Sequence, residues 1–71
     1  MKRGDIVVVA WGVNNGLNTP QKCLYDFGYY TKTGCIVYNH DETRAQDMHE
    51  FKRDEVRPAT KEEEETLNWG N

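Results

Sequence analysis

A run of β-branched residues near the start of the chain restricts its fold more than any other feature. Val7, Val8 and Val9 are consecutive and stand inside the apolar stretch 6–11. β-branched side chains lose conformational freedom in a helix and fit a pleated sheet well. The run therefore predicts a strand. Because its apolar residues are continuous rather than alternating, we expect the strand to be covered on both faces or to cross a curled barrel.

The next part of the chain alternates between turn signals and β-rich segments. Residues 12–20 are predicted to form a loop, since they contain an Asn-Gly turn pair and end in a proline. Strands are predicted at about 22–30 and 35–39, joined by a tight hairpin turn over 31–34. Gly28 allows the first of these strands to bend or bulge, as the strands of a barrel must.

The predicted hairpin fixes an expected register for the residues on either side of it. If the turn centres on residues 32–33, Tyr30 faces Cys35 and Phe27 lies opposite Tyr38. Cys23 is then far from Cys35 along the ladder, whereas bridged Cα atoms lie within ~7 Å of each other. With no export signal in the sequence, this geometry predicts two reduced thiols rather than a disulfide.

The second half of the chain predicts how the domain is completed. Residues 40–46 form a polar loop, residues 47–52 a fourth strand and residues 53–55 a 3₁₀ turn that leads into a short last strand. This succession predicts a mainly β fold, a small SH3-like barrel of about five strands over residues 1–58. Residues 59–71 are predicted to add an acidic helix packed on the same domain.

The start of that helix carries a specific signal. Thr60 followed by Glu63 matches the capping box, in which each residue's side chain accepts from the other's backbone N–H. We expect the helix to run to Asn68 or Trp69, where a glycine follows. A helix this short does not persist alone in water. Leu67 and Trp69 are therefore expected to dock on the barrel or on a partner.

Charge is distributed unevenly along the chain. The net charge is −3, yet residues 1–61 contain nine Lys or Arg and eight Asp or Glu, so the excess of acid is the run 62–65. A nearly neutral barrel disfavours nucleic-acid binding, which normally requires a basic stripe. The acidic run serves helix initiation and solubility, or a basic partner, or mimicry of nucleic-acid charge.

Targeting signals were considered separately. The longest apolar stretch has six residues, far below the ~20 of a membrane helix. The basic start lacks the apolar region and cleavage site of a signal peptide. The sequence therefore predicts a cytoplasmic protein without membrane association.

Aromatic residues are numerous for a chain of 71 residues, which contains eight of them. One interpretation is that they fill the thin core and the helix seam. The other is that some form a surface for a protein partner, because Tyr and Trp are enriched in such surfaces. The candidate partner-binding residues are Trp11, Tyr25, Tyr29, Tyr30, Tyr38 and Trp69. Tyr29 and Tyr30 are adjacent in a strand, so a one-sided sheet cannot bury both.

Metal, cofactor and catalytic chemistry find little support in the sequence. Cys23, Cys35, His40 and His49 lack the close ligand pairs of structural zinc sites. There is no glycine-rich phosphate loop, no GxSxG and no HExxH. A domain this thin is also expected to have little room for a ligand pocket of ~300 Å³ or more. We therefore expect no metal, no cofactor and no enzyme activity.

Two stretches resemble known proteins. Residues 2–9, KRGDIVVV, are similar to the K-x-G-D-x-V opening strand of many SH3-like barrels. Residues 56–63, VRPATKEE, resemble the R-x-A-T-x-E-E closure of small uncharacterised proteins from gut Bacteroidetes and their phages. The resemblance implies an SH3-like fold and this origin, and it carries no activity over to the chain.

These observations lead to one functional hypothesis and two alternatives. The first is a small non-enzymatic module that binds a protein through an aromatic barrel surface, as a phage accessory protein modulating a host or defence protein. One alternative is single-stranded nucleic-acid binding by aromatic stacking. Its phosphate contacts would be Lys22, Lys32, Arg44, Lys52, Arg53 and Arg57. The other alternative is an oligomerising structural subunit, since exposed edge strands favour self-association.

Overall fold

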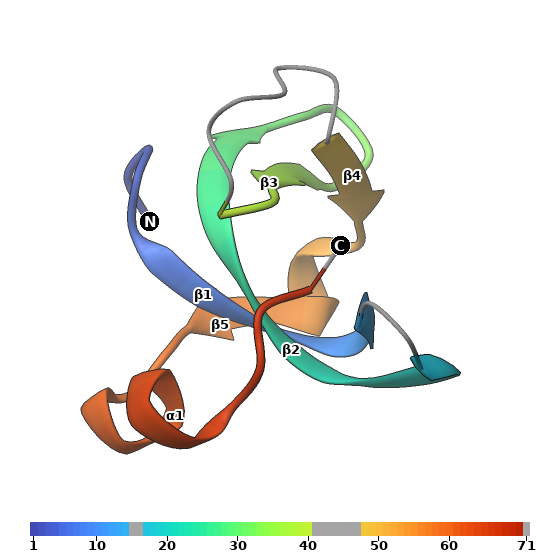
Figure 1. Ribbon diagram of the computed structural model, residues 1–71. Coiled ribbons are helices and arrows are strands. Elements are labelled where there is room, and N and C mark those ends of the chain that lie inside the picture. Colours follow the sequence, from blue (N-terminus) through green and yellow to red (C-terminus); the bar gives the residue numbers. More distant parts are fainter. Residues whose placement is uncertain (15–16, 41–47, 71) are drawn as a thin grey trace.

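The protein is built on one antiparallel sheet. The computed structural model describes residues 1–14, 17–40 and 48–70, with the backbone alone over 11–14 and 17–20. The strand order is β4-β3-β2-β1-β5, and every neighbouring pair is antiparallel (Figure 1). The strands are β1 Ile6–Asn14, β2 Leu17–Tyr30, β3 Cys35–Tyr38, β4 Met48–Phe51 and β5 Val56–Pro58. The mainly β prediction is confirmed, but β4 and β5 are edges, so the sheet is open rather than closed.

The valine run behaves as its sequence predicts. Val7 and Val9 belong to the inner core, and Val8 points to the opposite, outer face of the sheet. All three side chains are buried, which requires cover on both faces of β1. Val8 lies opposite Leu24 on β2 and Arg57 on β5. The continuous apolar run is therefore explained by two-sided burial.

The prediction of a loop over residues 12–20 is wrong for residues 12–14 and 17–20, which are strand. Residues 12–14 and 17–20 continue β1 and β2, with Gly12 opposite Gln21 and Val13 opposite Pro20. The predicted Asn-Gly turn at 15–16 lies outside the described residues. Asn14 lies opposite Leu17, so the strand pairing continues to the last described residue on each side.

The hairpin between β2 and β3 is partly as predicted. Tyr30 lies opposite Cys35, which is confirmed. Phe27, however, lies opposite Val37 and not Tyr38. The reason is a shift of the register between Phe27 and Tyr29. The shift is a β-bulge at the predicted glycine. One extra residue in β2 moves every earlier pairing by one position.

The inner face of the sheet holds a single apolar core. Its two cysteines are free, and burial raises the pKa of both thiols. Met1 and Phe51 pack against it from the rim. The core residues are Val7, Val9, Cys23, Tyr25, Phe27, Cys35, Val37 and Val56. No member of this cluster comes from the chain after β5.

The segment that leads into β5 matches the sequence closely. The fourth strand is β4, within the predicted span 47–52, whose first residue lies outside the described residues. The predicted 3₁₀ turn is present as η1, Arg53–Glu55. β5 begins where predicted and continues through Pro58.

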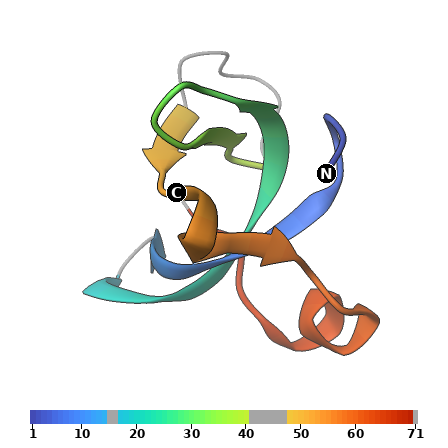
Figure 2. The same cartoon turned by 180° about the vertical axis from the view of Figure 1, so that it is seen from behind.

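The C-terminal helix, α1, begins as predicted and ends earlier. The Thr60 hydroxyl accepts from the Glu63 backbone N–H at 3.2 Å, and the Glu63 carboxylate accepts from the Thr60 N–H at 3.0 Å. α1 spans Lys61–Thr66, so the predicted end at 68 or 69 is wrong. Leu67 is already extended, because the residues after it pair with β2 instead of continuing the helix. Both views show α1 projecting beyond β5 and the chain then turning back across the sheet (Figures 1 and 2).

An ion pair connects α1 to β5. The Arg57 guanidinium donates to both oxygens of Glu63 at 2.7 and 2.5 Å. This contact, together with the Thr60 N–H, lowers the pKa of Glu63 from its ordinary 4.5 to about 2. Because the folded pKa is depressed, the stabilisation is complete above about pH 4.5 and is lost as the pH falls toward 2.

This ion pair yields a prediction for the helix. We expect the Glu63 carboxyl, followed by NMR, to titrate near pH 2 in the native chain, and α1 to fray over the same range. In Arg57→Gln the neutral partner no longer favours the carboxylate, so the titration should move up toward 4.5. Glu62, which has no ion-pair partner among the described residues, serves as the control carboxyl. An unchanged Glu63 titration in the variant would contradict the assignment.

Candidate functional site

The six candidate aromatic residues do not share one surface. Tyr25 is buried in the core, 1% exposed and with Gly70 against its ring, so the prediction that it forms part of an exposed aromatic surface is wrong. The side chain of Trp11 lies outside the described residues. Tyr29, Tyr38 and Trp69 lie on the outer face, and Tyr30 lies on the inner side. Alternation along the strands, shifted by the bulge, explains this division.

Cross-strand pairing assembles the outer face from three strands. Ile36 on β3 lies between Tyr29 on β2 and Glu50 on β4. In the next row, Tyr38 on β3 lies opposite Met48 on β4. Directly opposite residues share a face, so these side chains form one surface.

We call the four residues Tyr29, Ile36, Tyr38 and Met48 the outer aromatic patch. Tyr29 and Met48 are each 45% exposed, so large apolar groups of this patch face solvent. Ile36 is buried between its cross-strand neighbours and forms the floor. The sequence alone does not assign Ile36 or Met48 to a binding surface. The position of Ile36 two residues before Tyr38 in a strand does indicate that these two residues share a face.

The bulge glycine shapes this patch. A Cβ atom at Gly28 would lie 2.4 Å from Cε2 of Tyr38 and 2.9 Å from the Ile36 carbonyl oxygen. The Tyr38 ring therefore rests directly on the backbone of β2. The guanidinium carbon of Arg3 lies 5.6 Å from the centre of the same ring, within cation–π range. The ring is thus held from below by backbone and flanked by a cation.

A second aromatic arrangement continues the outer face toward the C-terminus. The rings of His40 and Trp69 are stacked, with centroids 4.0 Å apart and an interplanar angle of 18°. His40 Nδ1 lies 3.1 Å from a carboxylate oxygen of Asp26. Trp69 is half-buried and forms a parallel bridge with Leu24 of β2. Trp69 is therefore engaged within the fold itself.

Tyr30 is exposed but anchored on the inner side. Its ring packs edge-on against Phe27 at 5.0 Å, and the Arg53 guanidinium lies 5.1 Å from its centre. The N-terminal ammonium donates to its hydroxyl at 3.2 Å. The prediction that Tyr29 and Tyr30 cannot both be buried is confirmed, since they are 45% and 47% exposed. They nevertheless face opposite sides of the sheet.

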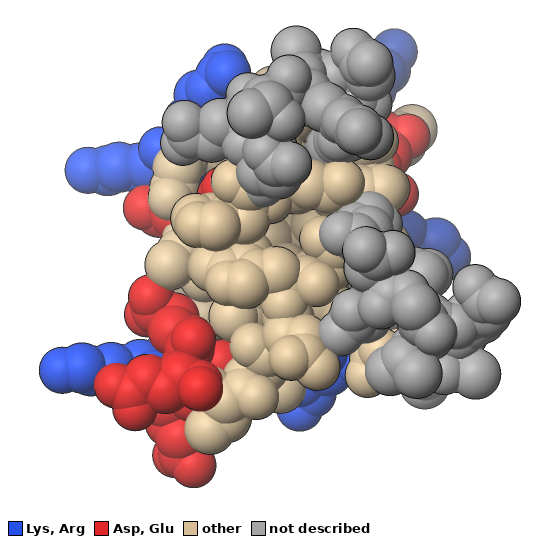
Figure 3. Space-filling view, viewed as in Figure 1, with Lys and Arg blue, Asp and Glu red and all other residues tan. Residues whose placement is uncertain are grey.

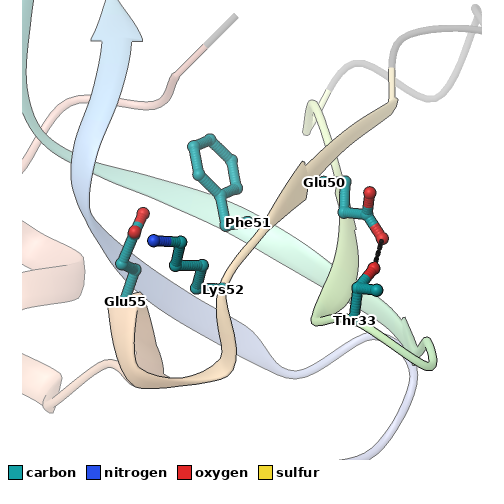
Figure 4. Close-up of a pocket in the computed structure, with 5 residues that line it drawn as sticks. All are labelled: Thr33, Glu50, Phe51, Lys52 and Glu55. Atoms are coloured by element: carbon teal, nitrogen blue, oxygen red, sulfur yellow. Dashed lines mark hydrogen bonds between the residues drawn. The ribbon is translucent and has the colours of Figure 1, made fainter.

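A concave surface lies beside β4 and η1. Its volume is about 370 Å³, larger than expected for so thin a domain, and it is open to solvent. The Glu50 carboxylate accepts from the hydroxyls of Thr31 and Thr33 at 2.8 and 3.0 Å. Figure 4 shows the lining residues, which are Thr33, Glu50, Phe51, Lys52 and Glu55.

The described residues form neither a metal-ligand cluster nor a membrane-spanning helix. Within 1–14, 17–40 and 48–70, no three His, Cys, Asp or Glu side chains come together as a metal site. No helix in the described part of the chain is long and apolar enough to span a bilayer.

Charge is also unequal on the surface. The face crossed by the C-terminal segment is uncharged over its centre, while acidic side chains gather over α1 (Figure 3). Basic side chains stand at the margins of this face rather than in a stripe across it (Figure 3). The centre of the face is therefore suited to contacts that do not depend on charge.

No family model matches the sequence, and no curated protein and no solved structure is significantly similar to it.

Proposed function

We propose that this chain is a small, non-enzymatic protein-binding module that recognises its partner through the outer aromatic patch. The observation that carries the proposal is the pair Tyr29 and Met48, each 45% exposed on the same face of the sheet. Large apolar side chains on a rigid surface bind a partner at low conformational cost. The four patch residues come from three adjacent strands, which hold them in fixed relation to each other.

The architecture supports an SH3-like assignment for this module. The meander from β1 to β4 is followed by a 3₁₀ turn and a short β5 that pairs with β1. Such a short turn and strand commonly complete SH3-like barrels. The resemblance of residues 56–63 to proteins of gut Bacteroidetes and their phages supports a host protein as the partner.

Two of the predicted phosphate contacts are already engaged within the fold, which favours a protein partner over a nucleic acid. Arg57, a predicted phosphate contact, is paired with Glu63. Arg53, a second predicted phosphate contact, donates to the carbonyls of Thr31 and Gly34 at 2.7 and 3.3 Å. Carboxylates also border the patch, which would repel phosphate. Arg44 lies outside the described residues.

The test compares two neighbouring tyrosines of equal exposure. Peptides selected from a random library against the native chain are titrated into isotope-labelled protein. We expect amide shifts centred on Tyr29, Ile36, Tyr38 and Met48. Tyr29→Ala should weaken binding by about tenfold or more, as for an interface hot spot. Tyr30→Ala removes a ring of the same size and exposure from the other side, so it should leave affinity within about twofold.

Two outcomes would contradict the proposal. One is peptide binding that Tyr30→Ala weakens and Tyr29→Ala does not. The other is binding of oligothymidylate with steep salt dependence and no selected peptide at all, which would assign the module to single-stranded nucleic acid.

A further inference from the structure

A second surface of the fold is already occupied by the chain's own C-terminus. We call residues 67–70 the C-terminal strap. The strap runs parallel to β2 on the side where β3 pairs only with residues 26–30. The Leu24 N–H donates to the Asn68 carbonyl and the Leu24 carbonyl accepts from the Gly70 N–H, both at 2.9 Å. The strap thus satisfies a backbone edge of β2 that, in the described part of the chain, no strand of the sheet covers.

Two adjacent residues of the strap, Trp69 and Gly70, contact the groove along this edge. Gly70 is buried against the Tyr25 ring, and a Cβ atom there would lie 2.1 Å from Cζ of Tyr25. The residue before it, Trp69, stacks on His40 at 4.0 Å. Neighbours in an extended segment point to opposite faces, so the groove accommodates an aromatic residue outside and leaves room only for glycine inside. The groove is therefore complementary to an aromatic residue followed by glycine.

The strap contributes no member to the core cluster, although Gly70 covers the ring of Tyr25. Every member of the core cluster lies at or before Val56. α1, which connects the strap to β5, buries no residue. Asn68 is exposed, and Leu67 and Trp69 are only half-buried. Among the described residues, the attachment comprises two backbone hydrogen bonds, the stack of Trp69 on His40 and the contact of Gly70 with Tyr25.

From this arrangement we propose that the edge of β2 at residues 23–25 is a binding groove for an extended segment of a partner protein. The segment carries an aromatic residue followed by glycine and aligns parallel to β2. Addition of a strand to an exposed edge is a general mode of peptide recognition, in which backbone bonds give affinity and side-chain pockets give specificity. The strap is the groove's internal ligand, and a partner displaces it. This inference uses a different surface from the outer aromatic patch and does not rest on it.

The strap is covalently joined to the domain, and this attachment determines how readily a partner can displace it. A ligand joined by a short flexible linker has an effective concentration in the millimolar range. The strap therefore competes with any partner segment, and loosening it should strengthen binding in trans. Removing the glycine contact is the most direct way to loosen it, because a side chain at position 70 meets the ring of a core tyrosine.

The test uses the full-length chain with position 70 changed. In Gly70→Val the new side chain excludes the strap, so the Leu24 amide should exchange with solvent at least about tenfold faster. Asn68→Ala, whose side chain is exposed and whose backbone bond remains, should leave that exchange unchanged. Trp69→Ala is a second loosened variant that introduces no clash into the core.

A synthetic peptide with the sequence of residues 66–71 is the probe. We expect it to bind the Gly70→Val chain, to shift the amides of Leu24 and Tyr25, and to bind the native chain at least about tenfold more weakly. The same peptide with valine in place of its glycine should not bind. Binding of both peptides alike, or no binding to either loosened variant, would overturn the proposal.

Two further measurements keep this test separate from the proposed function. Wild-type dimers with exchanged straps, detected by light scattering and mixed isotope labelling, would assign the groove to a second copy and overturn the partner assignment. Tyr29→Ala should leave peptide binding at the groove unchanged, so failure of one surface is distinguishable from failure of the other.

Discussion

Replacing Gly34 with alanine is expected to lower the free energy of unfolding by about 3 kcal/mol, at the upper end of overpacking costs. The new Cβ would lie 2.1 Å from the carbonyl oxygen of Phe51 and 3.0 Å from its carbonyl carbon. Both atoms belong to backbone, so no side-chain rotation relieves the clash. β3 and β4 would have to separate at the point where they are paired, at Cys35 and Phe51.

Gly34 also has little freedom to move away. Its N–H donates to the Thr31 hydroxyl at 2.9 Å, and its carbonyl accepts from the Thr31 N–H at 2.8 Å and from Arg53 Nε at 3.3 Å. A small domain has only ~5 kcal/mol of stability, so the loss is a large fraction of the total. Urea unfolding followed by tryptophan fluorescence measures it.

A second glycine provides the matched control. Gly4 has a φ of +92°, and no heavy atom lies within 4 Å of a Cβ built on it. Gly4→Ala therefore costs only backbone strain, about 1 kcal/mol. Equal losses in Gly4→Ala and Gly34→Ala would show that conformational freedom, rather than space, is the reason for both glycines.

Local signals in the sequence predicted the parts of the fold that depend on neighbouring residues. β-branching placed β1, and the capping box placed the start of α1 at Thr60. The 3₁₀ turn and the beginning of β5 were also correct. In each case, residues within one turn or strand determine the conformation, so no distant contact has to be known.

The errors share a different cause, which is contact between distant segments. The register of β2 with β3 was wrong because the bulge at Gly28 depends on the Tyr38 ring that lies over it. The end of α1 was wrong because residues after Thr66 gain more from pairing with Leu24 than from another helical turn. Neither partner is near in sequence, so local propensity gives no warning of it.

The candidate site was predictable only in part for the same reason. Alternation indicated that Tyr29 and Tyr30 must face opposite sides, and both are exposed. It did not indicate that Tyr25 lies inside, because a tyrosine fits either a core or a surface. Met48 joins the patch only through its position opposite Tyr38. The division of aromatic residues between core and surface is therefore the property that experiment should measure first.

Tyr25→Ala is expected to lower the free energy of unfolding by about 4 kcal/mol, as for a fully buried aromatic residue. The Tyr25 ring is in contact with His49 and Phe51 of β4, with centroids 5.4 and 5.8 Å away. On its other side lies the backbone of Gly70. Its removal opens a cavity between β2, β4 and the C-terminal strap, and these elements cannot collapse together without breaking their pairing. Tyr25→Phe keeps the ring and should cost much less.

The matching substitution on the surface separates the two roles of tyrosine in this chain. Tyr29→Ala removes a side chain of the same size that is 45% exposed, so its cost should stay below about 1 kcal/mol. Urea unfolding of the two variants under the same conditions gives the comparison. A loss near 3 kcal/mol or more in Tyr29→Ala would make Tyr29 a core residue and remove it from the outer aromatic patch. A small loss combined with weakened peptide binding is the result expected of a residue retained for recognition, because its ring then contributes to a partner and not to the fold.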